Sequence, residues 1–328
     1  MNKYFENKNV LITGGCGFLG SNLALELVHQ RAKVTIVDNL IPLYGGNEFN
    51  LAGIKDDIKL IFGDMCDMVL MEPLIEETDI LYHLGAQVSY IDSINIPYTD
   101  LDYNAKSTLL ILECCRKKNL ACKIVFSSSR MVYGKIFSDF VNEDSPTNPL
   151  SLYGIHKLTS EKYLSMYYKD FGIKSIILRI ANPYGPRQQI KHSKYSLVGW
   201  FIRQAMEDKE IKIYGSGSQL RDYIYVDDIV SAMILCAMSD DADGEILNIG
   251  SGISYEFCEM VREVVECVKK GNVINVPWPS DYENIETGDV KLDISRLKSL
   301  TGWEPIVSLT EGIRRTHEYY NNFFSEYL

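Results

Sequence analysis

Residues 10–20 read VLITGGCGFLG, a short apolar run followed directly by a glycine-rich turn. Residues 10–13 have the β-favouring composition of a buried strand, and a helical pattern begins at Ser21. Glycines stand at positions 14, 17 and 20. This spacing allows a tight turn, a close approach of the backbone to a pyrophosphate, and close packing of a helix on a strand. The helix that follows would present its N–H groups and the positive end of its dipole to the phosphates.

A second apolar run, at residues 34–37, ends at Asp38. An acidic side chain at the end of the second strand of such a unit hydrogen-bonds the adenosine ribose hydroxyls and repels a 2′-phosphate. A lone glycine motif is weak, but strand, glycine turn, helix, strand and acid occur here in order. The pattern predicts a dinucleotide site that prefers NAD to NADP.

Strand-like and helical patterns alternate through the first half of the chain. Strands are predicted at residues 10–13, 34–37, 58–62, 80–83, 123–128 and 174–180, and helices near 21–31, 69–76, 104–119 and 153–171. This alternation predicts an α/β fold, a doubly wound parallel sheet of the Rossmann type. Ligands bind at the carboxyl ends of such strands, where Asp38, Asp64, the segment after His83 and the serines at 127–129 fall.

The alternation breaks down after residue 182, where proline, glycine and polar residues become frequent. A long loop is expected from Gly185 to Ser196, with helices at 200–207, 255–269 and 308–324 and a further sheet strand at 246–250. We therefore expect an NAD-binding domain at 1–182, to which 227–254 returns, and a smaller, discontinuous lobe within 183–328 that binds the substrate.

Tyr153 and Lys157 are four residues apart in a helical pattern, so they share one face of the helix. An ammonium beside the phenol would lower its pKa toward the range of a general base. A Tyr-x-x-x-Lys pair alone is more often an ordinary surface pairing. Beside a dinucleotide motif, it indicates a base and a cation that tunes it.

Composition excludes several other classes of protein. A net charge of −11 argues against nucleic-acid or anionic-membrane partners, which select a basic face. The eight cysteines have no regular spacing, the polar start has no signal-peptide pattern, and no run approaches the ~20 apolar residues of a membrane span. The five histidines are scattered. We expect a cytoplasmic protein with free thiols, no membrane anchor and no metal site.

From Asn9 to about Tyr320 the chain resembles the extended short-chain dehydrogenase/reductases, within them the NAD-dependent nucleotide-sugar epimerase/dehydratase group. The residues that carry this resemblance are the glycine turn, Gly63–Asp64, residues 83–87, Asn104, residues 127–134, Tyr153 with Lys157, and the segments 179–186, 214–228 and 302–305. Members of this group use bound NAD to oxidise a sugar transiently.

The resemblance assigns roles residue by residue. It implies a catalytic set of Ser129, Tyr153 and Lys157. It implies a cofactor site made by Thr13, Gly14, Gly17, Phe18, Leu19, Asp38, Asn39, Asp64, Met65, Leu84, Ala86, Gln87, Asn104, Ser127, Tyr153, Lys157 and Ile180. It implies a substrate site made by Ser129, Arg130, Asn182, Arg187, Val198, Tyr214 and Arg221. Asp64 could instead serve only the turn after Gly63, Asn104 could be a plain helix N-cap, and Arg221 could be a surface arginine.

Two positions depart from the family pattern. Dehydratases and decarboxylases of the group carry an acid just after the catalytic serine, whereas Arg130 and Met131 follow Ser129 here. This favours epimerisation, and Arg130 could meet a carboxylate such as that of a uronic acid. Many epimerases have an arginine for the diphosphate at the position of Glu286.

The resemblance therefore implies an isomerase that inverts C4 of a nucleotide-linked hexose or uronic acid, with a UDP-sugar as the expected substrate. A dehydratase, decarboxylase or net oxidoreductase on the same fold remains an alternative. So does a NAD-binding protein without activity. The resemblance also implies a homodimer that pairs through helices 104–119 and 153–171, where Leu109, Leu112, Leu158 and Tyr163 could make apolar contacts.

Overall fold

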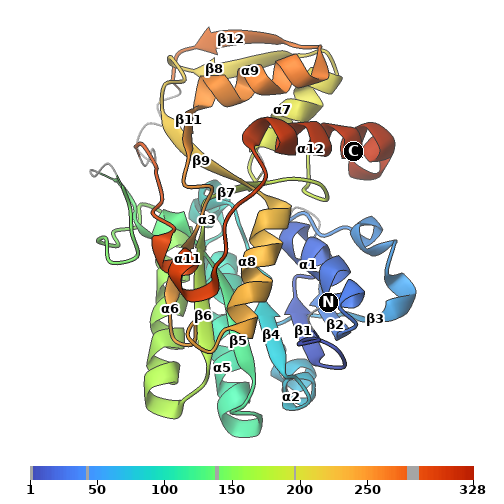
Figure 1. The fold of residues 1–328 in the computed structure, drawn as a ribbon, viewed down its shortest axis with the longest axis vertical. Helices are drawn as coiled ribbons and strands as arrows, with labels where there is room; N and C mark the ends of the chain where they lie inside the picture. The colour runs from blue at the N-terminus through green and yellow to red at the C-terminus, as the bar shows by residue number, and fades with distance from the viewer. Residues whose placement is uncertain (1–2, 42–43, 137–139, 196, 279–287) are drawn as a thin grey trace.

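A seven-stranded parallel sheet forms the centre of the chain (Figure 1). The computed structural model describes residues 3–41, 44–136, 140–195, 197–278 and 288–328. Its strands are β1 Asn9–Thr13, β2 Lys33–Asp38, β3 Ile58–Phe62, β4 Ile80–His83, β5 Lys123–Ser129, β6 Ser175–Ile180 and β10 Ile246–Ile249, in the spatial order β10-β6-β5-β4-β1-β2-β3. The predicted doubly wound fold is confirmed, and the predicted strands match the observed ones closely.

The two faces of the sheet bury separate apolar clusters because successive side chains of a strand point to opposite sides. On β1, Val10 and Ile12 join one cluster and Leu11 joins the other. Helices α1 Phe18–His29 and α8 Val226–Met238 cover the first face, and α2 Met68–Glu76, α5 Ser107–Lys118 and α6 Leu152–Phe171 cover the second.

Helix α1 begins at Phe18, three residues before the predicted start at Ser21. Gly17 is its N-cap in an extended conformation, so Gly20 lies inside the first turn and not in the loop. A Cβ on Gly20 would lie 2.3 Å from the Gly14 carbonyl oxygen. The third glycine is therefore needed for close packing of the helix on the turn, in line with the packing role expected from the glycine spacing.

The helix predicted at residues 104–119 has an irregular start. Short helices α3 Tyr90–Asn95 and α4 Pro97–Leu101 lead into a π-helical turn, η3 Asp102–Lys106, before α5 begins at Ser107. No helix in the described part of the chain is long and apolar enough to cross a bilayer.

The C-terminal part contains more strands than the sequence predicted. β7 Asn182–Tyr184, β9 Leu220–Tyr225 and β11 Ser254–Glu256 form a small sheet, and β8 Glu210–Tyr214 pairs with β12 Asn272–Val276. Helices α7 Leu197–Met206, α9 Phe257–Val268 and α12 Leu309–Phe323 pack around them, at the top in Figure 1, while α11 Ser295–Thr301 lies against β10. The helices predicted at 200–207, 255–269 and 308–324 are present within a few residues, but the short strands were missed.

Candidate active site

One cavity of about 920 Å³ runs from the carboxyl edge of the large sheet into the C-terminal elements. Most residues that the sequence predicted for the site line it. They are Gly14, Gly17, Phe18, Leu19, Asp38, Asn39, Met65, Leu84, Ala86, Ser127, Ser129, Arg130, Tyr153, Lys157, Ile180, Asn182, Val198, Tyr214 and Arg221. Segments at the carboxyl ends of six strands of the large sheet, together with residues of α1, α6 and α7, thus line one cavity.

The glycine turn and the start of α1 form a phosphate cradle on one side of this cavity. Gly14 has a φ of 71°, and a Cβ there would lie 2.7 Å from the Cα of Gly85. No side chain caps α1, so the N–H groups of its first turn and the positive end of its dipole face the cavity wall that Phe18 and Leu19 help to form. This backbone fits the pyrophosphate of a dinucleotide.

Asp38 stands at the end of β2, as the sequence predicted. Its Oδ2 accepts a hydrogen bond from the Cys16 amide and its Oδ1 one from the Leu40 amide, both at 2.9 Å. Burial raises the pKa of this carboxyl, while the two amides oppose the rise. Each carboxylate oxygen has a second acceptor direction, so the fixed carboxylate can also receive ribose hydroxyls.

Ser129 and Tyr153 both line the cavity. Ser129 ends β5 and Tyr153 is in the first turn of α6, which Ser151 caps by accepting from the Gly154 amide. The Ser129 hydroxyl favours the ionised form of the Tyr153 phenol. Burial raises the pKa of Tyr153 to about 12, although the Ser129 hydroxyl and the charge of Arg130 oppose the rise.

The expectation that Lys157 lowers the pKa of Tyr153 is therefore not met in the protein alone. The ammonium donates to the Ser127 carbonyl at 2.9 Å and lies 6.0 Å from the centroid of the Tyr153 ring. Lys157 is itself buried, which lowers its pKa to about 8. Desolvation of the phenol raises the pKa of Tyr153 more than the Lys157 ammonium, which points toward the Ser127 carbonyl, can lower it.

Three predicted cofactor residues lie behind the cavity wall. Thr13 is buried, accepts from the amides of Leu84 and Gly85 at 3.2 and 3.1 Å, and lies 2.9 Å from His83 Nδ1. Gln87 and Asn104 are buried and both donate to Asp100 Oδ2, at 2.9 and 3.1 Å. These side chains position the wall residues and do not line the cavity. The alternative of a plain N-cap fails for Asn104, because it lies within the π-helical turn.

Asp64 and Arg187 also do not line the cavity. Asp64 accepts from the Cys66 amide at 2.8 Å and from the Tyr103 hydroxyl at 3.1 Å, so it shapes the turn between Gly63 and Met65. Arg187 donates to Asn22 Oδ1 at 2.9 Å, and its guanidinium carbon lies 5.3 Å from the Tyr319 ring centroid. Through these two contacts, Arg187 holds the loop after β7 against α1 and α12.

The far side of the cavity is made by the C-terminal elements. Arg221 is buried on β9, and its guanidinium donates to the carbonyls of Leu220 and Gly288 at 2.8 and 2.9 Å. The rings of Tyr214 and Trp278 lie 5.7 Å apart, and both line the cavity. Arg221 is therefore a cavity cation, not a surface arginine. Glu286, where the family pattern has an arginine, lies outside the described residues.

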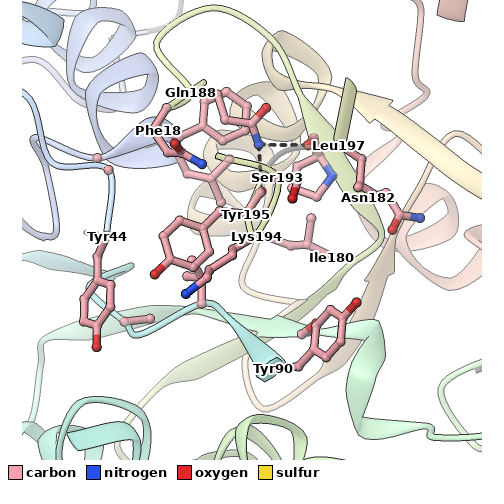
Figure 2. Close-up of a pocket in the computed structure, with 18 of the residues that line it drawn as sticks. Phe18, Tyr44, Tyr90, Ile180, Asn182, Gln188, Ser193, Lys194, Tyr195 and Leu197 are labelled. Atoms are coloured by element: carbon pink, nitrogen blue, oxygen red, sulfur yellow. Dashed lines mark hydrogen bonds between the residues drawn. The ribbon is translucent and has the colours of Figure 1, made fainter. Parts of the chain in front are cut away.

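The loop between β7 and α7 supplies a wall that the sequence did not predict (Figure 2). Tyr195 packs edge-on against Tyr44 with ring centroids 6.1 Å apart, and its hydroxyl donates to Asp92 at 3.3 Å. Lys194 pairs with the same carboxylate at 2.7 Å. Gln188 holds the loop by donating to the carbonyls of Pro183 and Tyr195. No local pattern marks these residues, because their partners come from distant segments.

A buried polar network supports the serine run from behind. Glu161, one turn after Lys157, accepts from Ser128 at 2.5 Å and from Arg179 at 2.7 Å. Asp100 pairs with His156 at 2.5 Å. These residues fix β5 against α6 and were missed, although the i, i+4 spacing of Lys157 and Glu161 was a usable signal. No cluster suited to a metal ion occurs among the described residues.

Comparison with known proteins gives one consistent result. Residues 10–250 match the model of the NAD dependent epimerase/dehydratase family. A putative UDP-glucose 4-epimerase of Methanocaldococcus jannaschii is 34% identical over 95% of this chain and 98% of its own length. A UDP-N-acetyl-alpha-D-glucosaminuronate decarboxylase of Bacillus cytotoxicus is 32% identical over 95% and 98%. The crystal structure of UDP-glucose 4-epimerase from Thermotoga maritima with UDP-glucose has a TM-score of 0.89 and 31% identity, covering 96% of this chain and 99% of that one.

Proposed function

Because the chain belongs to the NAD-dependent epimerase/dehydratase family, we propose that it is a nucleotide-sugar epimerase that inverts C4 of a UDP-linked hexose or uronic acid. NAD is the cofactor of this family, and the glycine cradle and Asp38 fit it. The similarity to UDP-glucose 4-epimerases over nearly the full length supports this reaction.

The observation that carries the proposal is the position of Ser129 and Tyr153. Both side chains line the cavity that the phosphate cradle and Arg221 also line. A sugar whose diphosphate binds near Arg221 would place a hydroxyl against this pair. The residues after Ser129 are Arg130 and Met131, which provide no acid for elimination or decarboxylation.

When bound by the glycine cradle and Asp38, NAD would supply reversible hydride transfer. Tyr153 takes the proton from the C4 hydroxyl as base, and Ser129 holds that hydroxyl by hydrogen bonding. The keto sugar turns in the cavity, and Tyr153 returns the proton after reduction on the opposite face. Lys157 remains charged at neutral pH and fixes the end of β5 through the Ser127 carbonyl.

The test is to incubate the purified protein with UDP-sugars and to follow the products by chromatography, NMR and mass spectrometry. The expected product is an isomer with the same mass as the substrate. Loss of the mass of water or of carbon dioxide would replace the epimerase with a dehydratase or decarboxylase. Tight NAD binding without conversion of any sugar nucleotide would favour a protein that binds NAD without activity.

We also propose that two copies pair through α5 and α6. On α6, Ile155 and Met166 are exposed and three turns apart, so they lie on one face. Among the predicted contacts, Leu112 is fully buried in the core and cannot contribute, whereas Leu109, Leu158 and Tyr163 are half-buried. Light scattering should give the mass of a dimer at micromolar concentration, and Ile155→Glu with Met166→Glu should give the monomer.

The proposed place of action is the cytoplasm. All eight cysteines are free thiols in the structure, and this supports the reducing compartment expected from their irregular spacing. Nucleotide sugars used by such an enzyme would be drawn from the same compartment.

A further inference from the structure

Arg130 holds a distinctive position in the cavity wall. It follows Ser129 directly, and its Nε and Nη2 each lie 3.2 Å from Asn182 Oδ1. Asn182 in turn donates to the Asp222 carbonyl at 2.7 Å (Figure 2 shows Asn182 at the cavity wall). The guanidinium is thus fixed from β7 and β9, one residue away from the serine of the reacting pair.

The neighbouring Tyr223 carries a buried hydroxyl that lacks a partner. Its side chain is 3% exposed and lines the same cavity. Among the described residues, none lies within hydrogen-bond distance of its Oη. A buried hydroxyl without a partner is unfavourable, so native structures usually provide one from a ligand or an ordered water.

The charge of Arg130 acts on both phenols of this region. It opposes the rise of the pKa that burial causes at Tyr153 and at Tyr223. Asp222, whose pKa burial raises to about 6, is held by donors of its own, from the Ser251 amide at 2.7 Å and the Gly252 amide at 3.2 Å. Arg130 and Tyr223 therefore line the same cavity as Ser129 and Tyr153, and their side chains are close enough for the Arg130 charge to act on both phenols.

We propose that the sugar carries a carboxylate on the carbon next to the reacting one, that Arg130 binds this carboxylate, and that the Tyr223 hydroxyl donates to it. The substrate class is then a nucleoside diphosphate uronic acid. A planar guanidinium matches both oxygens of a carboxylate, and a carboxylate also accepts from a hydroxyl. In a hexuronic acid the carboxyl is bonded to C5, the neighbour of C4. This inference rests on the proposed C4 epimerisation.

The chemistry of such a substrate gives the cation a second use. Oxidation at C4 makes a β-keto acid, which loses carbon dioxide when the electron pair of the C5–C6 bond moves into the enolate of the C4 ketone, and solvent then supplies a proton to C5. A guanidinium paired with the carboxylate stabilises the charge on its oxygens and opposes this movement. An epimerase that acts on uronic acids must prevent this loss of carbon dioxide from the 4-keto intermediate.

The experiment compares UDP-glucuronic acid with UDP-glucose, and uses UDP alone as the probe for the diphosphate contact. Initial rates and dissociation constants are measured for the wild-type protein, Arg130→Gln, Arg130→Lys and Tyr223→Phe, with the content of bound NAD as a check on folding. Wild type should show at least a tenfold higher kcat/KM, and tighter binding, for the uronic acid.

Arg130→Gln should lower kcat/KM for UDP-glucuronic acid by about 10- to 100-fold more than for UDP-glucose, since a hydrogen bond to a charged group is lost. Arg130→Lys should retain part of the wild-type preference for UDP-glucuronic acid. Tyr223→Phe should lower the ratio of kcat/KM for UDP-glucuronic acid to that for UDP-glucose by about threefold to tenfold. The affinity for UDP should change less than twofold in each variant.

Three results would overturn the inference. The first is a wild-type preference for UDP-glucose, and the second is an equal loss of kcat/KM for both sugars in Arg130→Gln. The third is a large loss of UDP affinity in Arg130→Gln, which would assign Arg130 to the diphosphate. Failure of the wild type to convert either sugar would count against the proposed epimerisation itself. In that case the two dissociation constants still decide whether the cavity discriminates in favour of a carboxylate.

Discussion

The two sides of the cavity are built in different ways. The cofactor side is made mainly of backbone: the glycine turn, the start of α1 and amides that hold Asp38. The sugar side is made of side chains from strands far apart in sequence, such as Asn182 on β7 and Arg221 and Tyr223 on β9. We propose that the backbone cradle binds the cofactor that the family shares, whereas the side chains of the opposite side select the sugar.

The largest expected effect comes from a residue that lies between the two sides. Tyr153→Phe removes the base without touching either side, so it should lower kcat by about 10³-fold or more while NAD stays bound. Ser129→Ala should lose about 10²-fold, since it removes the hydrogen-bonding partner. Rate measurements together with the absorbance of bound cofactor check both. Near-normal turnover by Tyr153→Phe would contradict the mechanism.

Gly14→Ala should break the cofactor side specifically. Its φ of 71° strains any other residue by about 1–3 kcal/mol, and its Cβ would meet Gly85, so NAD affinity should fall by about 10²-fold. Gly302 is the matched control, because it has a φ of 70° and nothing within 4 Å of an added Cβ. Gly302→Ala should lose some thermal stability and keep its cofactor. Equal cofactor loss in both variants would show that strain alone, and not the cradle, was responsible.

Arg221→Gln should weaken the sugar side and leave the cofactor side intact. Losing a charge-assisted contact to the diphosphate should cost about 10- to 30-fold in UDP affinity. Arg187→Gln is the control, since Arg187 pairs with Asn22 outside the cavity. Titration calorimetry with UDP measures both variants. If Arg187→Gln lost as much affinity as Arg221→Gln, the distinction between the two cations would be wrong.

The smallest expected effect concerns the choice between cofactors. Asp38→Ala removes the carboxylate that accepts ribose hydroxyls and repels a 2′-phosphate, so the NAD/NADP preference should shift about tenfold toward NADP. Competition between the two cofactors for the apo-protein measures the ratio. An unchanged ratio would mean that another residue selects NAD.

The sequence allowed prediction of the cofactor side because its determinants are local. The order of strand, glycine turn, helix and acid lies within residues 10–38, and the predicted strands of the large sheet were confirmed. β7, β9 and β11 were missed because each has only three to six residues and is stabilised by partners distant in sequence. Short strands of this kind have no periodicity to detect.

The predictions for single side chains show the same limit. Thr13 and Gln87 are next to wall residues in sequence, yet their side chains turn inward to bond with His83 and Asp100. The direction of the Tyr153 pKa shift was also predicted incorrectly. Helical spacing places Lys157 on the same face, but it does not reveal how strongly the phenol is buried or that the ammonium bonds the Ser127 carbonyl.

The position of β10 has a consequence for folding. This strand closes the large sheet beside β6, yet it follows β7, β8 and β9 in the chain, and α8 packs on α1 from the same late segment. A fragment that stops after β6 would expose the edge of β6 and the part of one apolar sheet face that α8 covers, a template for aggregation. The nascent chain therefore completes the large sheet only after β7, β8 and β9 of the C-terminal elements have been synthesised. Chaperone protection during that interval would matter more here than for a protein whose domains follow one another in sequence.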